Sequence, residues 1–158
     1  MTIDEIISFV DGLDGVLTLR PGPGDGTPEI AWGDKFFYYA PNGVVPQNTQ
    51  PFATIVTKNY PGDDKSELDP PEAFRVNVAA GKEAFIRWTG HSPKGSAASN
   101  DDPSASDVVI AHPVYGSNSW LAVKNPGERT DEILRELLRT AYQLARSRYE
   151  RRASAKSS

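Results

Sequence analysis

The sequence predicts an α+β fold in which an antiparallel β-sheet is packed by an N-terminal helix, a middle helix and a long C-terminal helix. Apolar residues near both ends of the chain recur with helical spacing, whereas the segments between them are short and apolar or alternate as strands do. The links between the strand-like segments are of hairpin length or irregular. No strand–helix–strand unit repeats, and a parallel sheet would need such a repeat.

The N-terminal helix is predicted from its first turn and from the stripe that follows. Thr2 and Glu5 have the form of a capping box, in which each side chain bonds the backbone N–H of the other residue. Apolar residues then follow at helical spacing: Ile3, Ile6, Ile7, Val10 and Leu13. Gly12 or Gly15 ends the helix.

Short apolar or alternating segments predict the strands. They cover residues 16–19, 30–32, 36–39, 52–57, 74–78, 108–111 and 120–123, and the second and third of them form a hairpin. In the third segment Phe36 and Tyr38 face one side of the sheet, and Phe37 and Tyr39 face the other. Either both faces of this strand are covered or one face is a binding surface.

Two segments between the strands have different compositions. Residues 81–88 predict a short middle helix, because Ala84, Phe85 and Trp88 form one apolar stripe. Residues 90–106 are rich in Ser, Ala, Asp, Pro and Gly and contain almost nothing to bury. They predict a long flexible loop.

The C-terminal helix begins after Thr130 as its N-cap, with Asp131 and Glu132 in the first turn, where acidic groups are favourable. Its buried stripe is long: Ile133, Leu134, Leu137, Leu138, Ala141, Leu144 and Ala145. The sequence thus predicts one α+β domain over residues 1–150 and a disordered tail over residues 151–158.

Composition limits the class of protein. A chain of 158 residues fits one domain that can bury a core without covalent staples. The absence of cysteine excludes disulfides, thiolate zinc sites and cysteine nucleophiles. No apolar run approaches the ~20 residues that span a bilayer, and the N-terminus lacks a signal-peptide pattern. We therefore expect a soluble, cytoplasmic protein with no membrane partner.

The net charge of −4 is unevenly distributed. Residues 1–128 hold 17 acidic and 9 basic side chains, whereas residues 129–158 hold 4 and 8. An acidic body disfavours nonspecific binding to nucleic acid, which depends on cations that displace counterions from phosphates. The basic C-terminus could make such contacts alone, but its arginines are also favourable simply as cations near the end of a helix.

The most distinctive stretch of the chain covers residues 112–123. His112, one of two histidines, lies across a turn from Tyr115, Asn118 and Trp120. These side chains could line a small polar pocket with His112 as an acid or base. The alternative is a hydrogen-bonded histidine at a strand end.

Three further binding candidates lie in or just before the aromatic strand: Trp32, Asp34 and Tyr38. An exposed tryptophan beside this strand would be a platform for a ligand. Positions in the core or at its rim are the simpler alternative for the tryptophans.

Metal, cofactor and nucleophile patterns are weak. His91, Asp101 and Asp102 have no recognised metal-ligand spacing. The acidic residues of the 59–71 loop (Asp63, Asp64, Glu67 and Asp69) lack the central glycine and closing glutamate of a calcium loop, so they predict a solvated acidic loop. Ser117 and Ser119 lie in no nucleophile elbow. We predict no metal, no cofactor and no catalytic residue.

Four pieces of the chain, in order, are shared with a known family. They are the first helix running into residues 13–16, the Ala-Trp-Gly-Asp of residues 31–34 before an aromatic strand, the strand of residues 74–78, and the Asn-Ser-Trp-Leu-Ala-Val of residues 118–123 before an acidic-capped helix. In these pieces the chain resembles the YjbR/MmcQ-like family of small bacterial proteins. The alternative is a separate family that shares only the fold.

The resemblance implies a CyaY-like α+β fold and a double-wing surface for DNA. The chain departs from the family at the turn, where Ser119 replaces the usual basic residue, and in its acidic body. Both departures argue against DNA binding.

Three functions remain, in order of preference. The first is a non-enzymatic domain that binds a small molecule or a protein, through the sheet and the 112–120 turn. The second is binding to nucleic acid, which the family resemblance and the basic C-terminus favour. The third is an enzyme that uses His112 as an acid or base.

Overall fold

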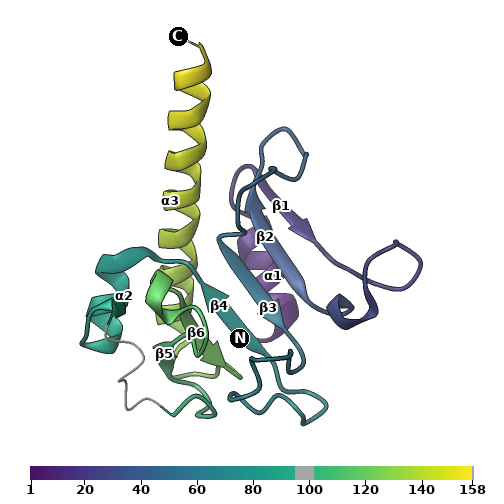
Figure 1. Cartoon of the computed structure of the whole chain (residues 1–158), viewed down its shortest axis with the longest axis vertical. Coiled ribbons are helices and arrows are strands. Elements are labelled where there is room, and N and C mark those ends of the chain that lie inside the picture. The colour runs from purple at the N-terminus through teal and green to yellow at the C-terminus, as the bar shows by residue number, and fades with distance from the viewer. Residues whose placement is uncertain (95–101, 158) are drawn as a thin grey trace.

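The computed structural model describes residues 1–94 and 102–157 and shows an α+β fold (Figure 1). Its strands are β1 (Val16–Leu19), β2 (Lys35–Tyr39), β3 (Ala53–Val56), β4 (Arg75–Val78), β5 (Val109–Ala111) and β6 (Leu121–Lys124). They form one sheet in the order β1-β2-β3-β4-β6-β5, and every neighbouring pair is antiparallel. The helices are α1 (Ile3–Asp11), α2 (Gly81–Thr89) and α3 (Asp131–Ser157). The predicted fold class is therefore confirmed.

The main core lies between one face of the sheet and the three helices, of which α2 contributes the buried Phe85. The capping box of Thr2 and Glu5 opens α1, and its buried stripe meets the strands. Residues of this core include Ile6, Val10, Phe37, Ile55, Val76, Val123, Leu134 and Leu138. In the register of the sheet Val76 pairs with both Ile55 and Val123, so the central strands bury a continuous apolar row beneath the helices.

The opposite face of the central strands is covered by the loop between β3 and β4. Arg75 is 1% exposed and donates two hydrogen bonds to Asp63 of this loop, at 2.9 and 2.6 Å. It also donates to Ser66 and to Asn77. Asp63 was expected in a solvated acidic loop. It is instead the half-buried partner of a buried arginine, because a cation so deep in the fold requires a paired acceptor.

Residues 30–32 were predicted as a strand, but residues Glu29–Ala31 form one turn of 3-10 helix, η1. Pro28 precedes this turn, and the backbone N–H groups of Ala31 and Trp32 donate to the carbonyl oxygens of Pro28 and Glu29, so they bond within the turn. The strand prediction was wrong here because the apolar Ile-Ala-Trp run carried no information on this local geometry.

The C-terminal helix begins at Asp131, directly after Thr130 as predicted, but two details differ from the prediction. The hydroxyl of Thr130 donates to Asp107 at 2.6 Å, so it acts as a donor to a loop carboxylate. Beyond residue 150, α3 continues to Ser157 and projects past the sheet (Figure 1). The segment predicted as a disordered tail is thus helical over residues 151–157, since Arg and Ala favour helix and no Gly or Pro interrupts it.

Part of the predicted 90–106 loop, residues 95–101, lies outside the described residues. Among the described residues, no helix combines the length and the apolar character needed to cross a membrane.

Candidate ligand-binding groove

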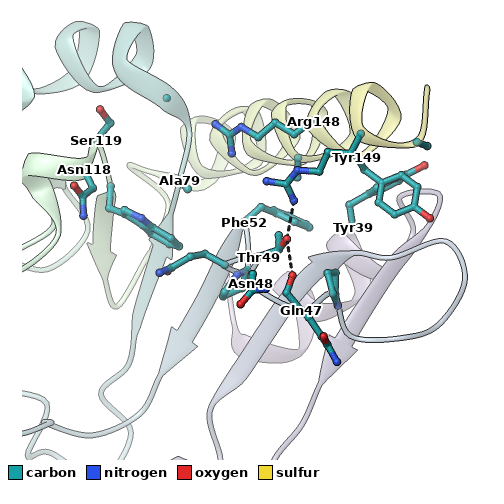
Figure 2. A pocket seen from close by; sticks show the side chains of 18 of the residues that line it. Tyr39, Gln47, Asn48, Thr49, Phe52, Ala79, Asn118, Ser119, Arg148 and Tyr149 are labelled. Atoms are coloured by element: carbon teal, nitrogen blue, oxygen red, sulfur yellow. Dashed lines mark hydrogen bonds between the residues drawn. The ribbon is translucent and has the colours of Figure 1, made fainter. Parts of the chain in front are cut away.

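A groove of about 850 Å³ lies between α3 and the loop that joins β2 to β3 (Figure 2). The turn before β6 and the junction of β4 with α2 complete it. Its lining residues are Tyr39, Asn42, residues 46–52, Ala79, Gly81, Lys82, residues 118–120, Ala145, Arg148, Tyr149, Arg152 and Ala153. The volume falls within the range of about 300–1,000 Å³ that is usual for small-molecule sites.

The charged side chains of the groove are all cations. Lys82, Arg148 and Arg152 line it, and no carboxylate does. Arg152 donates a hydrogen bond of 2.8 Å to Thr49 Oγ1 and so connects α3 to the opposite loop (Figure 2). Within the described part of the chain, Lys82 and Arg148 have no hydrogen-bonding or ion-pair partner, so both are available to an anion.

Aromatic side chains form the walls between these cations. Tyr39 of β2 and Tyr149 of α3 meet edge to face, with ring centroids 5.2 Å apart. The buried Phe52 forms part of the same lining, and Trp120 lines the groove at its other end. The groove therefore combines apolar rings with positive charge, a combination suited to a ligand that has both a ring and an anionic group.

The predicted site residues fall into three places. Asn118 and Trp120 line the groove, and Figure 2 shows Asn118 beside Ser119 at its edge. His112 and Tyr115 lie next to them, because the His112 ring contacts both the Tyr115 and the Trp120 rings, at 5.0 and 6.5 Å between centroids. The four residues therefore do not line one pocket. Asn118 and Trp120 form an edge of the groove, and His112 is buried next to them.

His112 supports this edge of the groove. It is 4% exposed, and its Nδ1 accepts hydrogen bonds of 3.0 Å from the backbone N–H groups of Val114 and Tyr115. Its Nε2 lies 3.1 Å from Nη2 of Arg75. Burial and the Arg75 guanidinium lower the pKa of His112 to about 3, and Asp63 offsets part of this effect. The ring is neutral at neutral pH and organises the turn.

Trp32 and Asp34 lie together elsewhere. Asp34 is completely buried and accepts hydrogen bonds from Thr57 (N–H and hydroxyl), Lys58 and Tyr60. Burial and the Asp34 carboxylate raise the pKa of Tyr60. Lys58 also donates to the carbonyl oxygen of Trp32 at 2.8 Å. This network joins the start of β2 to the end of β3, which is a structural task.

Tyr38 belongs to neither group. It pairs with Leu17 across β1 and β2, on the sheet face opposite Phe37, and is half-buried. Phe37 is completely buried and Tyr39 packs against the main core, so the helix-covered face of this strand is the Phe37 face.

Most of the groove could not be found from the sequence. Lys82 and Arg148 are 66 positions apart, and each follows the pattern of an ordinary exposed position on a helix. For these cations the sequence signal is the basic C-terminus, which contains Arg148 and Arg152 but gives no sign that they face a concave surface.

No metal site is evident among the described residues, where no three His, Asp or Glu side chains come together as ligands. Asp101, which the sequence places near His91 and Asp102, lies outside the described residues.

The chain belongs to DUF6194, a family of unknown function, whose model matches residues 1–154. No curated protein and no solved structure matches it. The resemblance to the YjbR/MmcQ-like family and the CyaY-like fold remain predictions.

Proposed function

We propose that this protein binds an anionic small molecule in the groove between α3 and the β2–β3 loop. The observation that carries the proposal is the charge of the lining: three cations and no carboxylate, in a chain whose net charge is −4. In an acidic protein, a concave surface lined only by positive charge attracts anions and disfavours cations.

This proposal refines the non-enzymatic binding domain that the sequence favours. Catalysis by His112 has less support, because a substrate in the groove would face Trp120, with the imidazole buried behind it. Binding to nucleic acid has one supporting observation, the exposed arginines of the projecting end of α3: Arg146, Arg148, Arg151 and Arg152. Duplex DNA therefore belongs in the same experiment.

The test is a titration with inorganic pyrophosphate, followed by isothermal calorimetry and by backbone amide shifts. We expect shifts at residues 47–50, 118–120 and 148–152, and an affinity at least about tenfold weaker for Arg148→Glu, because a cation in contact with the ligand is replaced by an anion. Arg151→Glu is the matched control. It makes the same charge change three residues along the same exposed helix, but Arg151 does not line the groove.

Equal losses in the two variants would show only a general effect of net charge and would contradict a site in the groove. Absence of binding at millimolar pyrophosphate would also contradict the proposal. Tighter binding of duplex DNA, with an affinity that falls steeply with salt and is weakened equally by both substitutions, would favour the nucleic-acid alternative.

A further inference from the structure

We infer that the anionic ligand of the groove is a nucleoside phosphate, with its phosphate against Lys82 and Arg148 and its base stacked on Trp120. This inference rests on the proposed anion-binding function and names the chemistry of the ligand.

Trp120 differs in its surroundings from the other two tryptophans. Trp88 packs against the main core, and the indole N–H of Trp32 donates to the carbonyl oxygen of Thr27 at 3.2 Å. Trp120 is half-buried at the edge of the groove, and within residues 1–94 and 102–157 its indole N–H has no acceptor. A large planar ring in this position is a stacking surface for another ring.

The Trp120 backbone is held in place by hydrogen bonds within the protein itself. The backbone N–H of His112 donates to the carbonyl oxygen of Trp120 at 2.9 Å, and Trp120 N–H donates to the carbonyl oxygen of Tyr115. The buried His112 ring and the Trp120 ring meet in a T-shaped arrangement. Because this end of the groove is held by neighbouring groups, ordering it on binding costs little.

The groove lining also contains polar side-chain amides. The side-chain amides of Gln47, Asn48, Gln50 and Asn118 line the groove and make no hydrogen bond within the described part of the chain. An amide offers both donors and an acceptor, as the edges of the bases do. The groove thus presents groups for a ring, a base edge and a phosphate, without a carboxylate to repel the phosphate.

A nucleoside phosphate could be a free nucleotide or the end of a single-stranded nucleic acid. We would titrate the wild-type protein with adenosine monophosphate, ribose 5-phosphate and a four-nucleotide single strand, using calorimetry and tryptophan fluorescence. Adenosine monophosphate should bind at least about fivefold more tightly than ribose 5-phosphate, since stacking adds to the phosphate contact. Its binding should also quench tryptophan fluorescence.

Trp120→Leu should remove this preference and the quenching while leaving the affinity for ribose 5-phosphate unchanged. Tyr115→Leu is the matched control, because Tyr115 lies on the same turn, is 52% exposed and does not line the groove. It should keep the preference for the nucleotide.

Equal affinities for ribose 5-phosphate and adenosine monophosphate, with both lost in Arg148→Glu, would overturn the nucleoside phosphate and leave the anion site standing. No binding of either compound, together with no binding of pyrophosphate, would overturn both proposals. Tighter binding of the single strand than of the mononucleotide would identify a strand end as the source, and the reverse order would identify a free nucleotide.

Discussion

His112 is a histidine whose environment, on balance, favours the neutral form. Two backbone N–H groups point at Nδ1, the Arg75 guanidinium lies beside Nε2, and the ring is 4% exposed. Of the charged groups that face it, Asp63 alone favours protonation, and that carboxylate already accepts two hydrogen bonds from Arg75. The cost of charging this ring should therefore be visible as a pH dependence of stability.

The folded pKa of His112, about 3, lies below its ordinary value of 6.5, so below pH 6.5 the unfolded chain takes up a proton that the folded chain does not. As the pH falls below 6.5, this group should lower the free energy of unfolding by at most about 1.4 kcal/mol per pH unit. Above pH 7 it should have no effect on stability. His112→Asn retains an acceptor near the position of Nδ1 but does not titrate. We expect the stability advantage of wild type over this variant to shrink by about 2 kcal/mol between pH 6.5 and 4.5.

Urea unfolding at four pH values across that interval measures this difference. A constant difference between the two proteins would contradict the buried, neutral state of His112.

At the scale of the elements, α3 has two halves with different tasks. Its first half buries Leu134, Leu137 and Leu138 against the sheet, whereas the half beyond Ala145 is largely exposed and contributes Arg148 and Tyr149 to the groove. Stability should therefore depend on the first half and ligand binding on the second.

Leu138→Ala should cost about 2–5 kcal/mol of unfolding free energy, because the side chain is completely buried and leaves a cavity. A chain that ends at Ser147 should lose less than Leu138→Ala, since it gives up the edge contact of Tyr149 with Tyr39 and exposed polar contacts such as the Arg152–Thr49 hydrogen bond, which contribute little. The same truncation should abolish pyrophosphate binding. Urea melts and calorimetry test both halves, and a truncated chain less stable than Leu138→Ala would refute the division.

The helices were predictable because their signals are local. The stripes of α1 and α3 follow from spacing alone, and both lie where the spacing places them. Residues 29–34 were not predictable, because Asp34 finds its partners at Thr57, Lys58 and Tyr60, more than twenty positions away. An isolated apolar run before Gly33 looks like a strand until that network is known.

The candidate site was predictable only where its residues carry a local signal. Asn118 and Trp120 stood out because their turn is unusual in itself. The cations opposite them come from α2 and α3, and only the packing of these helices beside the β2–β3 loop brings Lys82 and Arg148 to one concave surface.

For the molecule as a whole, the centre of the sheet is shielded on both faces. All residues of β3, β4 and β6 are buried, by the helices on one face and partly by the Arg75-linked loop on the other. The edge strand β1 differs. Every residue of β1 is partly exposed, and β1 has β2 as its one partner strand among the described residues.

Native-state hydrogen exchange should therefore be uneven across the sheet. The hydrogen-bonded amides of β3, β4 and β6 should exchange only when the whole molecule unfolds, so their protection should equal the unfolding free energy measured in urea. Those of β1 should exchange through local opening, with lower protection that is insensitive to low urea concentrations, because opening an edge strand exposes little surface. Equal protection and equal urea dependence in β1 and β4 would mean that the sheet opens as one unit and that burial at its centre does not set the order of unfolding.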